Sequence, residues 1–124
     1  MRLASIRIIT HDVDRLAAFY ERVIGTAATR PAPVFAEFRS DAGTLAIASP
    51  ATVGSLGERA PRPASNASVI IEFVVDDVDA EFARLQSTLD DIVLEPTTMP
   101  WGNRSTIFSD PDGNLVNLFS RPTA

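Results

Sequence analysis

The sequence contains no cysteine and no lysine, and histidine, tryptophan and tyrosine occur once each. Without cysteine the chain can form no disulfide bond, thiolate nucleophile or cysteine-ligated zinc site. No apolar run approaches the roughly 18 residues that a membrane-spanning helix needs. The N-terminal stretch MRLASIRIITHD also lacks the apolar core and cleavage site of a secretory signal. We therefore expect a cytoplasmic protein with no membrane partner.

Basic residues are also fewer than acidic residues. The chain has 11 basic and 16 acidic residues, a net charge of -5, and its arginines are scattered along the sequence. An acidic protein of this kind is disfavoured as a binder of nucleic acid or of an anionic membrane. What is present, 124 residues of which 45% are hydrophobic, is typical of one soluble domain with a real core.

The chain repeats itself. Residues 8–20, IITHDVDRLAAFY, match residues 73–85, FVVDDVDAEFARL, at an offset of 65. In both segments a β-branched run ends in Asp-Val-Asp and passes into a helical pattern, so Asp12 and Asp77 are predicted helix N-caps. The first helix is expected to end at Gly25. The predicted apolar stripes are Val13, Leu16, Ala17, Tyr20 and Ile24 in the first helix and Val78, Phe82, Leu85 and Leu89 in the second.

A second repeat follows in each half. FRSDAGTLAIA at residues 38–48 resembles FSDPDGNLVNLF at residues 108–119, with Gly43 and Gly113 related by an offset of 70. Each half therefore reads β-α-β-β-β, and we predict an α+β fold built from two tandem units.

Residues 1–49 and 66–122 form the two predicted units. Residues 50–65 between them are rich in Pro and Gly without strong periodicity, which indicates a linker or flexible flap. Neither half is large enough to stand alone, so we expect residues 1–124 to form a single domain.

Two motifs carry a resemblance to a known family. The strand-to-helix entry with Asp12, Val13, Phe19 and Tyr20, and the Pro-Trp-Gly to Asp-Pro-Asp-Gly-Asn ending at 100–114, resemble the vicinal oxygen chelate superfamily. That superfamily contains glyoxalase I, the bleomycin-resistance proteins and the extradiol dioxygenases. The resemblance spans nearly the whole chain. It implies that each sheet curls into a half-barrel cup, that paired cups enclose a ligand, and that the protein is a homodimer.

The resemblance also implies where a metal would bind. In metal-dependent relatives a His lies seven residues before the capping Asp and a Glu lies four residues after the turn Gly of each unit. These positions hold Ser5, Ile70, Ile47 and Asn117 here. Catalytic metal sites need two or three His or carboxylate ligands. We therefore predict no metal and no other cofactor. Asn117 stands where metal-binding relatives have a carboxylate ligand, and it is a candidate ligand-binding residue. Alternatively, its amide forms hydrogen bonds within the cup and contacts no ligand.

Strand alternation predicts which side chains face the cup. If Ser5 points inward, Arg7 and its symmetry mate Glu72 lie on the concave face. The pair is either a structural ion pair or two solvated charges, or else Arg7 binds an anionic ligand group while Glu72 binds an amine or acts as a base. His11 is a second, weaker candidate base, or simply a turn residue at the helix entry.

Trp101 is the remaining signal because its indole offers a flat stacking surface. Phe35 and Phe119 could join it if the linker folds over the cup. Trp101 could instead be a rim or dimer-contact residue. The ligand-binding candidates are Arg7, Phe35, Ile47, Glu72, Trp101, Asn117 and Phe119.

These observations favour a metal-independent protein that resembles the bleomycin-resistance type. It would sequester a planar or partly apolar small molecule and have no catalytic residues. The alternative is a metal-independent lyase or isomerase with Glu72 or His11 as general base. A ligand-sensing or partner-binding module is a third class, since one fold hosts many activities.

Overall fold

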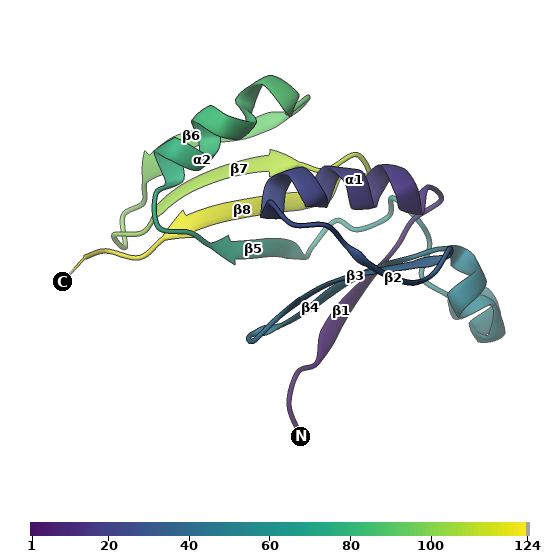
Figure 1. Cartoon of the computed structure of the whole chain (residues 1–124). Coiled ribbons are helices and arrows are strands. Elements are labelled where there is room, and N and C mark those ends of the chain that lie inside the picture. Colours follow the sequence, from purple (N-terminus) through teal and green to yellow (C-terminus); the bar gives the residue numbers. More distant parts are fainter. Residues whose placement is uncertain (124) are drawn as a thin grey trace. The chain divides into compact units, whose positions relative to one another are not determined.

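A computed structural model describes residues 1–123 of the chain. It divides into two compact units, Met1–Ser65 and Asn66–Ala124. Each unit contains a sheet and an α-helix that lies along it (Figure 1).

Unit 1 has the order β-α-β-β-β, followed by a 3₁₀ helix. Its first strand, β1, pairs in parallel with β4, and β4, β3 and β2 pair antiparallel, which gives the sheet order β1-β4-β3-β2. The elements are β1 (Ser5–Ile9), α1 (Val13–Ile24), β2 (Thr29–Ala32), β3 (Phe35–Ser40), β4 (Gly43–Ala48) and η1 (Pro50–Arg59).

Unit 2 repeats this arrangement with the sheet order β5-β8-β7-β6, again with one parallel pair, β5 and β8. The predicted α+β fold with two tandem β-α-β-β-β units is therefore confirmed. The elements are β5 (Ile70–Val74), α2 (Val78–Leu85), η2 (Gln86–Thr88), β6 (Ile92–Thr98), β7 (Arg104–Ser109) and β8 (Leu115–Ser120).

Both helices begin where the sequence predicts. The carboxylate of Asp12 accepts a hydrogen bond from the backbone N–H of Arg15 at 3.0 Å, and that of Asp77 accepts one from Ala80 at 3.0 Å. Helix α1 ends at Gly25, whose φ of 85° is the left-handed conformation that glycine adopts without strain. The symmetric caps set both helices at the same place after the first strand of each unit.

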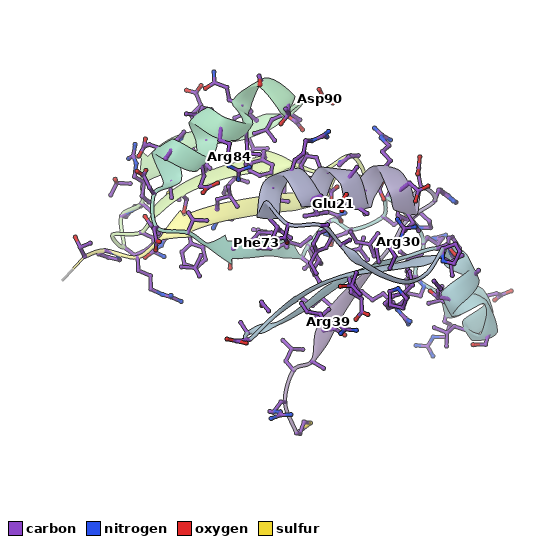
Figure 2. All side chains as sticks on the ribbon, in the orientation of Figure 1. Glu21, Arg30, Arg39, Phe73, Arg84 and Asp90 are labelled. Atoms are coloured by element: carbon purple, nitrogen blue, oxygen red, sulfur yellow. The ribbon has the colours of Figure 1, made fainter. Side chains whose placement is uncertain are left out.

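Each helix packs on one face of its own sheet. In unit 1, Tyr20 of α1 is fully buried and its ring centroid lies 6.5 Å from that of Phe38 on β3. In unit 2, α2 packs on the face that carries Phe108, Val116 and Leu118, all of which are buried. Phe73 of β5, labelled in Figure 2, has the same strand parity.

The segment predicted as a linker or flap has structure of its own. Residues 50–59 form η1, and its Val53 is buried against Ile9 and Ala48. Phe35 packs on the same cluster. Apolar periodicity missed this element because one Val anchors it, and because Gly57 interrupts the helix with a non-helical φ of 61°.

No helix within residues 1–123 is both long enough and apolar enough to cross a membrane.

Candidate functional site

The face of each sheet that its helix does not cover is called the inner face. Strand pairing arranges it in three rows, each running across three strands. In unit 2 the rows are Ile70–Leu115–Ser109, Glu72–Asn117–Ile107 and Val74–Phe119–Ser105. In unit 1 they are Ser5–Thr44–Arg39, Arg7–Ala46–Glu37 and Ile9–Ala48–Phe35. Arg39 is labelled on β3 in Figure 2.

The middle row of unit 2 brings two of the candidate residues together. Glu72 on β5 and Asn117 on β8 are register partners, and the Asn117 Nδ2 donates a hydrogen bond of 2.8 Å to the Glu72 Oε2. Glu72 is exposed, whereas Asn117 is 9% exposed. This bond fixes the orientation of the amide, because a flipped amide would aim its oxygen at a carboxylate.

The other half of that amide has no partner. Within residues 1–123, the Asn117 Oδ1 is buried and accepts no hydrogen bond. A buried acceptor left unpaired costs about 1–3 kcal/mol, so native proteins pair nearly all of them. The inner face of unit 2 therefore contains a fixed acceptor that lacks a donor, beside a carboxylate.

Apolar side chains surround this pair. Ile70 and Val74 flank Glu72 on β5 and are 47% and 58% exposed. Ile107 and Phe119 are partly buried beside Asn117. The guanidinium carbon of Arg121 lies 5.5 Å from the centroid of the Phe119 ring, a cation-π contact.

The inner face of unit 1 differs at the equivalent positions. Arg7 takes the place of Glu72, and Ala46 takes the place of Asn117. Arg7 is exposed, and its register pairing with Ala46 places it in the middle row of the inner face. In the same row Glu37 accepts a hydrogen bond of 3.1 Å from Arg39. Arg7 and Glu72 belong to different units, and their pairing stays a prediction.

One inward assignment is wrong by one residue. Ile47 is the register partner of Ile8 and Ala36, in the strand parity of Phe38, so it lies on the α1 face and is fully buried there. Ala46 occupies the inner position instead. Gly43 and Gly113 misled the count, because Gly43 is the first residue of β4 whereas Gly113 lies two residues before β8.

The donor set at the family's metal positions does not fit a metal. It comprises the hydroxyl of Ser5, the amide of Asn117, the hydrocarbon side chain of Ile70, and either Ile47 or, by register, Ala46. One hydroxyl and one amide fall short of the ligands that transition metals need. Across residues 1–123 no cluster of three or more His, Asp or Glu side chains has metal-binding geometry.

His11, Trp101 and Phe35 lie outside the middle row of unit 2. His11 is exposed in the bend between β1 and α1, beside the N-cap. Trp101 is 67% exposed in the turn between β6 and β7, which is closed by a 2.9 Å bond from the Gly102 N–H to the Met99 carbonyl. Phe35 lies on the inner face of unit 1, where it packs against the cluster of Ile9, Ala48 and Val53.

A bidentate ion pair lies on the helix face of unit 2. Both guanidinium nitrogens Nε and Nη2 of Arg104 donate to the carboxylate of Asp79 in α2, at 2.7 and 2.8 Å. These hydrogen bonds lower the pKa of Asp79 below its ordinary value and raise the pKa of Arg104. The pair ties α2 to β7. It lies outside the three inner-face rows of unit 2, in which Glu72 is the only charged side chain.

The direct bond between Glu72 and Asn117 was not predicted. A signal for it exists in the sequence, because parallel pairing of the first and fourth strands places inward residues of both strands in one row. The sequence offsets of the two repeats identify Asn117 as the partner of Glu72 only after the register of β5 on β8 is known.

Comparison with known proteins places this geometry in a family. Residues 2–118 match the family model described as the Glyoxalase/Bleomycin resistance protein/Dioxygenase superfamily. The chain belongs to this superfamily, as its motifs predict. No curated protein matches the sequence.

Solved structures of the same fold are numerous. A glyoxalase/bleomycin resistance protein/dioxygenase family enzyme from Burkholderia phytofirmans PsJN superposes with a TM-score of 0.84 at 17% identity, over 97% of this chain and 98% of that one. A protein of the same description from Nocardioides gives 0.80 at 21% identity, over 100% and 85%. Lactoylglutathione lyase from Agrobacterium tumefaciens gives 0.72 at 22% identity, over 95% and 92%. At these identities the likeness shows the fold alone.

Proposed function

We propose that this protein binds a small, partly apolar molecule on the inner face of unit 2 and does so without a metal. The observation that carries the proposal is the Asn117 Oδ1, a buried acceptor without a donor that is held in place by Glu72. The oxygen is covered by neighbouring atoms, so a ligand that donates to it must first shift them; the new hydrogen bond then removes the cost of the unpaired group.

The surroundings support a ligand with an apolar body. Ile70 and Val74 expose hydrocarbon beside Glu72, and the Phe119 ring offers a flat surface. Small-molecule sites commonly combine such apolar walls with a few fixed polar groups. Bleomycin-resistance proteins, which give the superfamily part of its name, are the model for this function. Binding by sequestration needs no nucleophile or base.

The test is a search for the bound molecule. Native mass spectrometry of the freshly purified protein is expected to show a noncovalent organic adduct, and denaturation should release it. The matched control is Asn117→Leu, which removes the acceptor and should be isolated without the adduct. An adduct retained in full by this variant would place the binding site elsewhere. The absence of any ligand, in both a native preparation and a broad thermal-shift screen, would contradict the proposal.

Glu72 favours a second candidate function, a metal-independent lyase or isomerase. Its carboxylate lies on the inner face within hydrogen-bond distance of an amide, as a general base beside an orienting group would. One solved structure of the same fold is named as a lyase. His11 is less suited to this role because it lies in the bend outside the strand rows.

The two functions separate by turnover. If Glu72 is a base, Glu72→Gln should abolish conversion of a bound compound while a neutral ligand still binds, since the amide keeps a similar shape and an acceptor oxygen. If the protein only sequesters its ligand, the compound is recovered unchanged from both proteins. Detectable turnover that is lost in Glu72→Gln would replace the sequestration proposal with the enzyme.

A further inference from the structure

We infer that the ligand is an organic cation, an ammonium or amidinium group attached to an apolar body. This inference rests on the proposed binding site and names the chemical class of its ligand. Two features point to it independently: the polarity of the Glu72–Asn117 row, and the place where the chain's own Arg121 lies.

The middle row of unit 2 presents acceptors only. The Asn117 Nδ2 is committed to Glu72, so the free atom of that amide is Oδ1, and the carboxylate of Glu72 accepts as well. A ligand must therefore bring N–H or O–H donors. An anionic or purely acceptor group would meet two oxygens and no donor within this row, which is unfavourable in a partly buried site.

Charge then selects among donors. Glu72 is the only acidic or basic side chain in the three inner-face rows of unit 2, and the ion pairs of the described residues do not include it. Hydrogen bonds from a cationic N–H to a carboxylate are about twice as strong as neutral ones. A planar amidinium or a primary ammonium carries more than one N–H, so it can donate to the carboxylate and to Asn117 Oδ1 together.

A metal cation fits the same two oxygens poorly. Calcium takes six to eight oxygen ligands, and magnesium demands octahedral geometry. This row supplies one carboxylate and one amide oxygen, and its neighbours Ile70, Val74 and Ile107 are hydrocarbon. Hydrocarbon walls around a few acceptors suit an organic cation, whose carbon atoms need burial and whose nitrogen needs pairing.

Arg121 supplies the second observation. Its guanidinium lies over the ring of Phe119, one row from Glu72 and Asn117, at 5.5 Å from the ring centroid. The ring already holds a planar cation in the free protein. A cationic ligand would use the same ring face and displace the Arg121 side chain, which projects from the segment after β8.

Three naphthalene derivatives of one shape test the inference: the amidine, the amide and the carboxylate. They are cationic, neutral and anionic at neutral pH, and all three present the same ring. Binding is followed by NMR titration of the isotope-labelled protein, read at the side-chain amide of Asn117. The amidine is expected to bind at least tenfold more tightly than the amide, and the carboxylate is expected not to bind.

Substitutions test whether Glu72 causes the preference for the amidine over the amide. Glu72→Gln should reduce the affinity for the amidine to that of the amide and leave the amide within about twofold. The matched control is Glu81→Gln, which removes the same charge from α2 on the opposite side of the sheet and should keep the preference. Arg121→Gln, which removes the internal cation from Phe119, should strengthen binding of the amidine by about twofold or more.

Each outcome has one meaning. If the amide binds as tightly as the amidine, or if the carboxylate binds best, the ligand is not a cation, while small-molecule binding at this face still stands. If the preference for the amidine survives Glu72→Gln, the assigned residue is wrong and the inference is overturned. If none of the three compounds shifts the Asn117 amide, the face is not a ligand site, and the inference and the proposed function both fall.

Discussion

Replacing Asn117 by leucine should leave the fold as stable as before, or more stable, although Asn117 is a buried residue. Leucine has the same number and branching of side-chain heavy atoms as asparagine but has no polar atoms. The substitution therefore removes both the hydrogen bond to Glu72 and the unpaired Oδ1 acceptor. A structural amide would lose stability when replaced in this way, whereas an amide that serves a ligand would not.

The expected magnitude follows from the two halves of the amide. Removing the unpaired Oδ1 relieves a desolvation cost of about 1–3 kcal/mol. Losing the bond from Nδ2 costs about 1 kcal/mol, below the usual range for a charged partner, because the exposed Glu72 carboxylate is rehydrated by water. The free energy of unfolding should thus rise by between roughly zero and 2 kcal/mol.

Asn114 provides a matched control only three residues away. It is 4% exposed, its Nδ2 donates to the Asp110 carboxylate at 2.8 Å, and its Oδ1 accepts from Asn66 at 3.2 Å. Here both halves of the amide are paired, and one partner is a buried carboxylate. Asn114→Leu should lower the free energy of unfolding by about 2–4 kcal/mol, because it weakens the pairing of that charge.

Urea unfolding followed by far-ultraviolet circular dichroism measures both variants. The same substitution should give opposite or clearly separated effects at the two sites. If Asn117→Leu destabilises the protein as much as Asn114→Leu does, the amide of Asn117 is a structural group. The unpaired oxygen then carries no information about a ligand, and the reasoning is refuted.

Four further outcomes are expected. Purified protein without an affinity tag should contain no stoichiometric transition metal, and elemental analysis that finds one Ni, Zn, Fe or Mn per chain would contradict the donor argument. Light scattering should give a dimer at micromolar concentration, and a particle of monomer mass would count against the assembly that the superfamily resemblance implies. A planar ligand that reaches Trp101 should quench its fluorescence, and Trp101→Ala should weaken binding by roughly 1 kcal/mol; if neither effect is seen with a confirmed ligand, Trp101 is a rim residue. The Asp79–Arg104 pair lowers the pKa of Asp79, so it stabilises the fold above the ordinary carboxyl pKa, and this contribution is lost as pH falls through the lowered value. Asp79→Asn should therefore be less stable than the native protein at neutral pH and approach it in strong acid, and a gap that persists unchanged in acid would sink this explanation.

The architecture was predictable because local and repeated signals agree. Asp12 and Asp77 stand before apolar stripes of helical period, and each cap forms as predicted. Alternation along β5 correctly turns Phe73 toward the helix face and Glu72 away from it. These inferences need only the helical and strand periodicities of the apolar residues, which can be read directly from the sequence.

The site was less accessible because it depends on pairing between distant strands. Two glycines looked equivalent, but the chain turns from β3 into β4 over two residues and from β7 into β8 over five. A count from glycine is therefore shifted by one between the units, which is enough to move Ile47 to the other face. Likewise, whether the Oδ1 of Asn117 finds a hydrogen-bond donor depends on the folded surroundings, which residue types alone do not reveal.

The row of Glu72 and Asn117 lies wholly within one of two duplicated units, and the other unit holds Arg7 and Ala46 at the matching places. Duplication followed by such divergence frees one copy from the constraints on the other. Substitutions on β5 and β8 can therefore accumulate while the first copy keeps its own sequence. Because each row is formed by strands of its own unit, a substitution in the Glu72–Asn117 row leaves the strand pairing of the matching row in unit 1 unchanged.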